Sequence, residues 1–130
     1  MDDKTVLLRQ IEQRHIQNSV VSSLAFRPRE DIDKGLLSVY DGDLIAPKES
    51  AVHFGTFPDC VSIGVLGLTV SCCTEEKLSC RPDPEEFPEH AVIDFTPHNE
   101  SQRRKISGKI KDRALARGWL FGPLIEIASE

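Results

Sequence analysis

The sequence predicts an α+β fold: a small mixed sheet of about four to five strands, covered by an N-terminal helix and a long basic C-terminal helix. Three observations lead to this prediction. The chain has 130 residues, of which 39% are hydrophobic and 28% charged, which suits one globular domain spanning residues 1–130. Short runs of β-forming residues and helical patterns follow one another without the regular alternation of an α/β protein. Glycine, proline and aspartate separate these runs, as turn-forming residues do.

The predicted elements come in a mixed order. Along the chain we expect a helix over 6–16, strands over 20–26 and 36–40, a short helix over 47–54, a strand over 61–70, one or two helical turns over 71–78, a strand over 90–95 and a helix over 99–117. The residues 119–121 offer a further short edge strand.

The first four elements rest on periodicity and on proline. Leucine and isoleucine recur at modest helical spacing over 6–16. The segment 20–26 is rich in β-forming residues, and Pro28 must end that strand because proline cannot donate to a sheet. A second strand over 36–40 runs into an Asp-Gly-Asp turn. Pro47 then stands in the first turn of the short helix, where its missing N–H costs nothing.

The later elements have clearer signals. Residues are apolar or small on both faces of 61–70, which predicts a strand covered on both sides. Apolar residues alternate over 90–95, as in a strand with one buried face. Asn99 and Gln102 stand at capping-box spacing at the start of the last helix, and Gly118 is a natural stop.

Charge is distributed unevenly along the chain. The net charge of -5 argues against a surface that coats a polyanion throughout. The last helix nevertheless carries a cluster of cations, and an acidic segment with three prolines precedes the strand over 90–95. The pattern is typical of a solvated helix face, and the alternative is a docking surface for an acidic partner or a phosphate backbone. The candidate partner-binding residues are Arg103, Arg104, Lys105, Lys109, Lys111, Arg113, Asp83, Glu85, Glu86 and Glu89.

Metal, cofactor and membrane classes find no support in the sequence. The four cysteines show no CxxC motif, and their spacing to the histidines matches no usual zinc site. Phosphate-loop, dinucleotide and common hydrolase motifs are missing as well, so we expect no cofactor. The longest run without a charge, 60–74, is too short to cross a membrane. The acidic start of the chain does not resemble a secretory leader, and we expect a cytoplasmic protein with reduced thiols.

Four side chains are candidates for catalysis. Arg27 and Arg29 follow the strand over 20–26 and suit a phosphate or carboxylate, although surface arginines in a charged loop have the same appearance. His53 and His90 are candidate acids or bases. The alternative for His53 is a packed, half-buried residue, and the alternative for His90 is a strand-edge histidine satisfied by solvent or a backbone group. His90 and Asp94 share a strand face but lie roughly 13 Å apart, so any partner of His90 comes from elsewhere.

Three segments carry a resemblance. Residues 22–28 (SSLAFRP), 36–43 (LLSVYDGD) and 90–95 (HAVIDF) resemble recurring blocks of small, uncharacterised bacterial proteins. The resemblance covers about three quarters of the chain and implies a bacterial cytosolic protein, an accessory or regulatory protein of a multi-gene system. It implies no activity and no site residue.

Three functional hypotheses follow. The first is a non-enzymatic module that docks on a protein partner through the basic helix and the acidic, proline-rich loop. The second is a small metal-independent RNA- or nucleotide-processing enzyme that uses Arg27, Arg29, His53 and His90, and it requires Arg27 and the histidines to share a pocket. Convergence of Tyr40 with them would suit a ribonuclease or ADP-ribosyl-transfer site. The third is salt-sensitive nucleic-acid binding by the basic helix.

Overall fold

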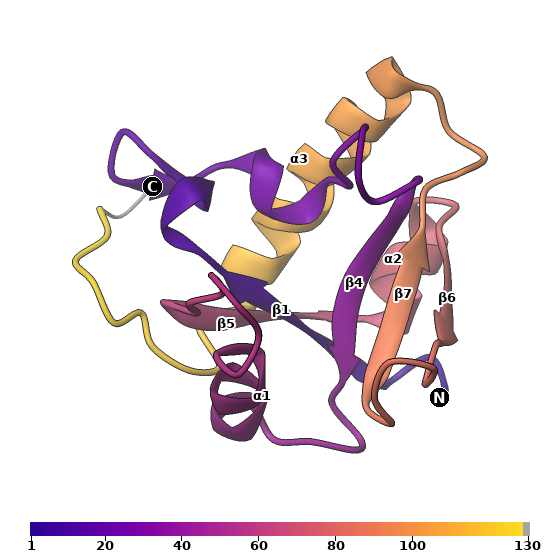
Figure 1. The fold of residues 1–130 in the computed structure, drawn as a ribbon. Helices are drawn as coiled ribbons and strands as arrows, with labels where there is room; N and C mark the ends of the chain where they lie inside the picture. The colour runs from indigo at the N-terminus through magenta and orange to yellow at the C-terminus, as the bar shows by residue number, and fades with distance from the viewer. Residues whose placement is uncertain (129–130) are drawn as a thin grey trace.

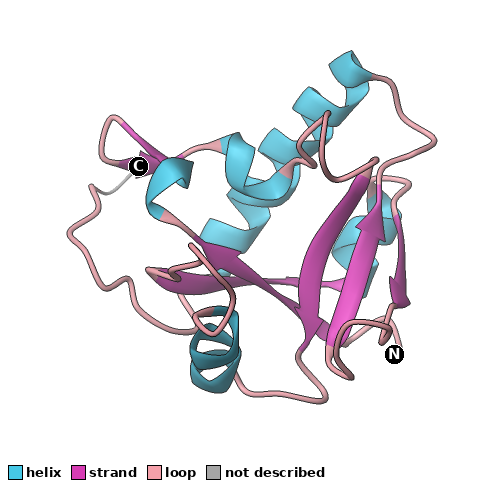
Figure 2. Ribbon diagram, in the orientation of Figure 1, coloured by secondary structure: helices cyan, strands magenta, loops and turns pink. Residues whose placement is uncertain are grey.

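The computed structural model describes residues 1–128 and has an α+β fold built on a five-stranded sheet (Figures 1 and 2). The strand order is β5-β1-β4-β7-β6, and every pairing is antiparallel, whereas we predicted a mixed sheet. The strands are β1 (Val6–Ile11), β4 (Leu36–Asp41), β5 (Gly64–Thr69), β6 (Ser79–Pro82) and β7 (His90–Asp94). A separate two-stranded ribbon joins β2 (Ile16–Gln17) to β3 (Val20–Val21).

Three α-helices and two short 3-10 helices complete the fold. They are α1 (Pro47–Phe54), α2 (Val70–Glu75), α3 (Glu100–Arg117), η1 (Gln13–His15) and η2 (Ser23–Phe26). The predicted helices over 47–54 and 99–117 are confirmed. The α3 capping box forms as expected, because Asn99 accepts from the Gln102 N–H at 2.9 Å and donates its own N–H to the Gln102 side chain at 2.8 Å.

The predicted N-terminal helix is found only in part. Val6–Ile11 is the strand β1, and helical structure in this region is limited to the 3-10 turn η1. The cause is the central position of β1, which pairs with β5 on one side and β4 on the other. Leu7 faces one core and Leu8 the other. A strand that is buried on both faces carries adjacent apolar residues, and their spacing along the sequence resembles that of an amphipathic helix. The predicted strand over 20–26 likewise divides into β3 and η2.

Helices cover both faces of the sheet, as Figure 2 shows. On one face, Ile106 and Ile110 of α3 pack with Leu7 and Leu37 in the larger buried cluster. On the other face, α1 covers a smaller cluster around Leu8, Tyr40 and Val65. No helix among residues 1–128 combines the length and the apolar character needed to cross a bilayer.

The sheet is split between its two central strands. β1 and β5 pair along the full length of β1, but β1 and β4 pair only at Leu7↔Asp41 and Leu8↔Tyr40. Beyond these pairs the two strands diverge, and Figure 1 shows the opening between them. The Arg9 guanidinium fills part of it, donating to the Ala25 carbonyl at 2.6 Å and the Ser38 carbonyl at 2.9 Å. The side chain thus satisfies a carbonyl on β4 that has lost its strand partner.

Candidate functional site

The split in the sheet opens into a cleft of about 460 Å³. This volume falls in the usual range for pockets that hold small molecules. Strand residues form its floor, and the segments after β1, before β4, after α1 and before β7 form its walls. The residues that line the cleft include Arg9, Gln10, Arg14, Arg29, Ser38, Tyr40, Phe57, Phe87 and His90.

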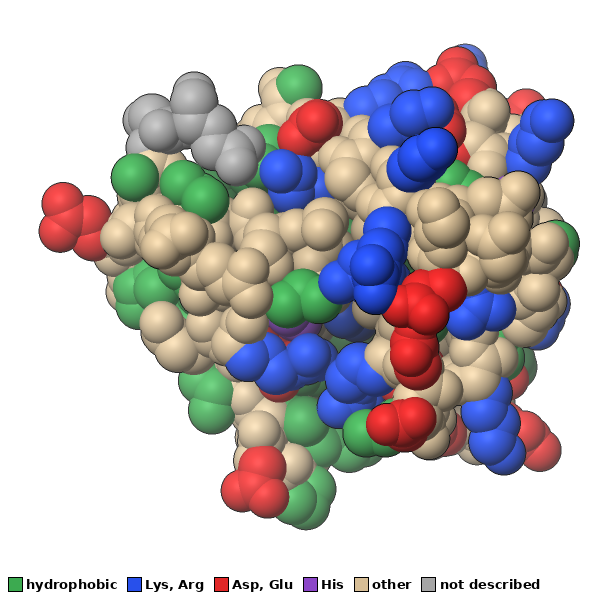
Figure 3. Space-filling model, turned by 90° about the horizontal axis from the view of Figure 1, so that it is seen from above, with side chains coloured by type: hydrophobic (Ala, Val, Ile, Leu, Met, Phe, Trp, Pro, Cys, Tyr) green, Lys and Arg blue, Asp and Glu red, His purple; other side chains and the backbone are tan. Residues whose placement is uncertain are grey.

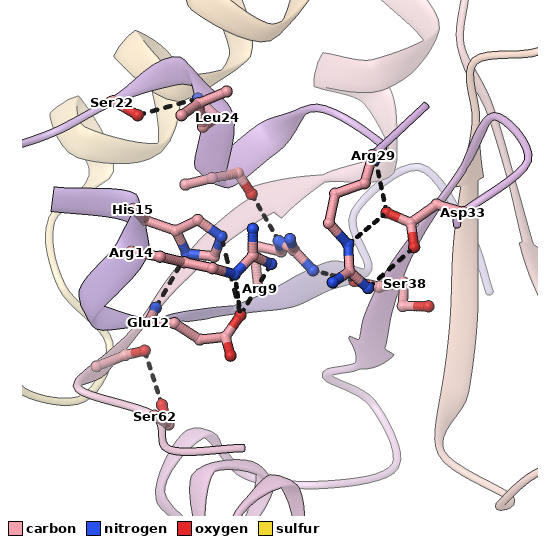
Figure 4. A network of polar contacts seen from close by, with 12 residues as sticks. Arg9, Glu12, Arg14, His15, Ser22, Leu24, Arg29, Asp33, Ser38 and Ser62 are labelled. Carbon is pink, nitrogen blue, oxygen red and sulfur yellow. Dashed lines mark hydrogen bonds and ion pairs between the residues drawn. The ribbon is translucent and has the colours of Figure 1, made fainter. Parts of the chain in front are cut away.

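One end of the cleft is strongly basic. The guanidinium groups of Arg9, Arg14 and Arg29 point toward one another in Figure 4. Arg14 pairs with Glu12 at 3.0 Å, and Arg29 pairs with Asp33 at 3.3 Å. Arg9 donates to two carbonyl oxygens and forms no ion pair with a carboxylate among the described residues. Of the three arginines at this end, Arg9 alone lacks a carboxylate partner, while Asp59 and Glu86 also line the cleft.

The environment of Arg9 disfavours its charged form. Burial, followed by the charge of Arg14, lowers the pKa of Arg9 to about 10. Removing a cation from water without a carboxylate partner is unfavourable, so such groups are normally paired or serve a ligand. An anion bound between the three guanidinium groups would supply the missing charge.

His15 is buried next to the basic end of the cleft. Its side chain is fully buried, and its Nδ1 accepts the Glu12 N–H at 3.0 Å, so the ring proton of the neutral form sits on Nε2. Burial, followed by the charge of Arg9, lowers the pKa of His15 to about 3. His15 is consequently neutral at pH 7 and adds no charge to the arginine cluster.

The other end of the cleft is aromatic. The ring of Phe87 lies 5.0 Å from that of His90, 5.1 Å from that of Tyr40 and 5.9 Å from that of Phe57, measured between ring centres. His53 lies behind this wall, where its Nδ1 and the Tyr40 hydroxyl share a hydrogen bond of 2.8 Å. Burial raises the pKa of Tyr40, which keeps its hydroxyl neutral. Planar rings suit this surface, because they pack offset or edge-on against aromatic side chains.

Ser38, His90 and Asp83 form a chain of hydrogen bonds at the floor. Ser38 Oγ lies 3.2 Å from His90 Nε2, and His90 Nδ1 lies 2.8 Å from the Asp83 carbonyl oxygen. The Asp83 carboxylate is also near, with 3.3 Å between its Oδ2 and Nδ1. Sheet register produces this geometry: Tyr40 pairs with His90 and Ser38 with Val92, so Ser38 and His90 are diagonal neighbours on one face.

Gln10 lines the cleft, and its side-chain oxygen is an unsatisfied acceptor buried beneath the surface. The residue is 4% exposed, and its Oε1 has no hydrogen-bond partner among the described residues. Its amide orientation is fixed, because Nε2 donates to Ser50 Oγ at 2.7 Å while Ser50 donates to the Pro47 carbonyl. A buried acceptor without a donor is costly, so Gln10 Oε1 lowers the stability of the fold.

The structure brings together three of the four predicted catalytic residues. Arg29 and His90 line the cleft, and His53 contacts its aromatic wall through Tyr40. Arg27 lies instead beside a separate surface hollow with Glu100, and it does not line the cleft. The requirement that Arg27 share a pocket with the histidines is therefore not met, and Arg9, Arg14 and Arg29 are the arginines that share the cleft with His90. The sequence analysis missed Arg9, Arg14 and Ser38, because their relevance depends on where β1 leaves β4.

The exclusion of a His90–Asp94 pair is confirmed. Asp94 accepts from the Thr96 hydroxyl at 2.6 Å and from Arg81 at 2.9 Å, and the Thr96 hydroxyl is the main cause of its lowered pKa. The partner of His90 comes from elsewhere, as expected, and it is Asp83.

The predicted docking residues have other partners as well. Glu86 lines the cleft, and Asp83 contacts His90. On α3, most cations form ion pairs within the chain. Arg103 is different, because it donates to the backbone carbonyls of Phe95 and His98. The ion pairs are Arg104–Glu100, Lys109–Glu76, Lys111–Asp112 and Arg113–Glu75. Figure 3 shows the resulting mixture of basic and acidic side chains on this face of the molecule.

The described residues contain no group of three or more side chains suited to a metal ion, and the four cysteines are free thiols. No protein-family model, curated protein or solved structure matches the chain. The geometry of the cleft is therefore the basis for the functional proposal.

Proposed function

We propose that this chain is a small nucleotide-processing enzyme that binds a phosphorylated substrate in the cleft and needs no metal ion. The convergence of Arg9, Arg14 and Arg29 beside His90 carries this proposal. Guanidinium groups bind phosphate oxygens in bidentate fashion, and three of them supply the positive charge that a metal ion provides in many phosphate sites.

The two ends of the cleft suit the two ends of a nucleotide. The basic end takes the phosphate, which gives Arg9 the counter-charge that it lacks inside the chain. The aromatic wall around Phe87 takes the base, because every base has a flat face that stacks on an aromatic ring.

An enzyme is favoured over a passive binder because of the polar groups at the floor. His90 is 6% exposed, lines the cleft and is held by Asp83 on the side facing away from Ser38. A histidine oriented by a second group and aimed at a hydroxyl is the arrangement used for general acid–base chemistry. Simple ligand binding has no need of such a chain.

Titration calorimetry with adenosine, guanosine, cytidine and uridine 5′-monophosphates tests this proposal. We expect binding of at least one of them, weakened about tenfold or more by Arg29→Gln, because a charge-assisted bond is lost. Arg117→Gln removes an equal charge from the far end of α3 and should leave the affinity unchanged. The absence of binding to all four would contradict the proposal. Binding only to long RNA with a steep salt dependence would instead support the nucleic-acid hypothesis.

Protein docking remains a second proposal. Glu85, Glu86 and Lys105 are exposed, which supports it. The geometry supports it less than the cleft, because most α3 cations already pair with carboxylates of the same chain. Co-purification of a partner in low salt, lost with Glu85→Lys, would favour docking.

A further inference from the structure

We propose that Ser38 is the nucleophile of this site and accepts the phosphoryl group of a phosphate monoester. This inference rests on the proposed function, because it assumes that the guanidinium groups hold a phosphate. It adds a residue role and a reaction that the binding of a nucleotide does not require.

The position of Ser38 is the first step of the argument. Leu37 and Val39 point into the large core, so Ser38 points to the opposite face, where the cleft lies. The residue is exposed, and its hydroxyl lies 3.2 Å from His90 Nε2. An exposed hydroxyl in hydrogen-bond contact with a buried histidine has the geometry of a nucleophile and its base.

The direction of the hydrogen bonds is the second step. The Asp83 carbonyl can only accept, so His90 Nδ1 must carry a proton and donate it at 2.8 Å. His90 Nε2 is then unprotonated in the neutral ring and accepts the Ser38 hydroxyl proton. Once that proton has moved to Nε2, the Asp83 carboxylate, 3.3 Å from Nδ1, stabilises the imidazolium.

The location of the positive charge is the third step. Arg9 donates to the backbone carbonyl of Ser38, which brings its guanidinium to the strand that carries the nucleophile. Arg29 and Arg14 point toward the same place (Figure 4). A phosphoryl group in transfer spreads negative charge over three oxygens, and this cluster is suited to stabilise that charge. The oxyanion of an acyl transfer carries one charge on one oxygen and needs no such cluster.

The reaction has two balanced halves. In the first, Ser38 Oγ gives its proton to His90 Nε2 and forms a bond to phosphorus. The bond from phosphorus to the leaving oxygen breaks on the opposite side, and that oxygen takes a proton from water. The products are phosphoserine and a free alcohol such as a nucleoside. In the second, water enters on the side opposite Ser38, loses a proton to solvent and bonds to phosphorus, and the Ser38 oxygen leaves with the proton held by His90. Inorganic phosphate is released, and the overall reaction consumes one water.

A fluorophosphonate probe tests the reactivity of Ser38 directly, because it bonds to activated serine hydroxyls with loss of fluoride. We expect one adduct, mapped by peptide mass spectrometry to Ser38 and missing in Ser38→Ala. Ser79→Ala, which removes an exposed hydroxyl on β6, is the matched control and should label like the wild type. His90→Asn should slow labelling about a hundredfold or more, since the base is lost.

Asp83→Asn separates the two roles of Asp83 and avoids a buried substitution. The backbone carbonyl still fixes the His90 tautomer, so we expect labelling to slow only about tenfold, far less than in His90→Asn. Circular dichroism and adenosine monophosphate titration of each variant show whether the cleft is intact. Equal labelling rates in His90→Asn and the wild type would overturn the role of His90.

Four further outcomes decide the proposal. Hydrolysis of p-nitrophenyl phosphate, lost in Ser38→Ala, supports phosphoryl transfer, whereas Ser38-dependent turnover of p-nitrophenyl acetate alone overturns it. Failure of the probe to label a protein that binds nucleotides overturns the role of Ser38 and leaves the proposed function in place. Failure to bind any nucleotide, with Ser38 still labelled, overturns the proposed function instead.

Discussion

At the scale of single residues, His15 makes stability depend on pH. Its pKa is about 3 in the folded chain and near 6.5 in an unfolded one, so the unfolded chain binds the extra proton between these values. The stabilisation is complete above pH 6.5 and is lost as the pH falls. We expect His15 to lower the free energy of unfolding by about 1.4 kcal/mol per unit below pH 6.

His15→Asn isolates this effect. Asparagine can still accept the Glu12 N–H but cannot be protonated, so the loss of stability between pH 7 and pH 5 should be smaller than in the wild type. Urea unfolding at pH 5, 6 and 7 measures it, with Gln17→Asn, an exposed substitution that changes no titratable group, as the control. An unchanged slope in His15→Asn would show that the buried ring does not control acid stability.

Gln10 gives a second prediction at this scale. Gln10→Leu removes the unsatisfied oxygen and leaves Ser50 bonded to the Pro47 carbonyl, so we expect little loss of stability. Urea unfolding measures the stability, and Gln13→Leu, at an exposed position, is the control. A loss of more than about 2 kcal/mol in Gln10→Leu would show that the buried oxygen is satisfied in the folded protein.

At the scale of elements, local signals predicted α3 well and β1 poorly. The capping box and Gly118 define α3 from neighbouring residues alone. The strand character of β1 comes from its pairing with β4 and β5, which no local pattern records. The site was predicted only in part for the same reason. Arg29 and His90 could be named as candidates from residue type, but Ser38 meets His90 through sheet register, and Asp83 meets it from the loop after β6.

Substitution of two glycines by alanine should change the free energy of unfolding in opposite directions. A Cβ at Gly108, inside α3, meets nothing within 4 Å, so Gly108→Ala should raise the free energy of unfolding by about 1 kcal/mol. A Cβ at Gly64 would overlap the Trp119 ring, so Gly64→Ala should lower it. Chemical unfolding of both variants checks this, and stabilisation by Gly64→Ala would contradict the packing of Trp119 over β5.

At the scale of the whole molecule, the sequence showed that charge is distributed unevenly, but it did not show which cations form ion pairs within the fold. The basic helix is next to carboxylates because α2 packs beside α3, where Glu75 meets Arg113 and Glu76 meets Lys109. The uncompensated positive charge is instead at Arg9, in a segment whose sequence predicted an ordinary helix. Pairing across the fold, rather than local charge density, therefore decides which cations are open to a ligand.

The segment after α3 protects the open edge of the sheet, which yields the last prediction. It passes β5 in Figure 1, and Val65 and Phe121 form an isolated β-bridge there. The Leu120 N–H donates to the Val65 carbonyl at 2.9 Å, and the Leu124 N–H donates to the Ile63 carbonyl at 2.7 Å. An uncovered edge strand pairs with other chains. Truncation after Gly118 should therefore cost about 3 kcal/mol or more through the loss of Trp119 and promote self-association.

Sedimentation velocity and urea unfolding measure both effects. Leu124→Ala is the control, because its side chain is 62% exposed and its backbone bond to Ile63 is retained. We expect that variant to stay monomeric to the same degree as the wild type and to unfold at the same urea concentration. A truncated chain as stable and as monomeric as the full chain would show that β5 needs no cover. Because β5 also pairs with β1, weakening this edge should in addition widen the split in which Arg9 lies and reduce nucleotide affinity.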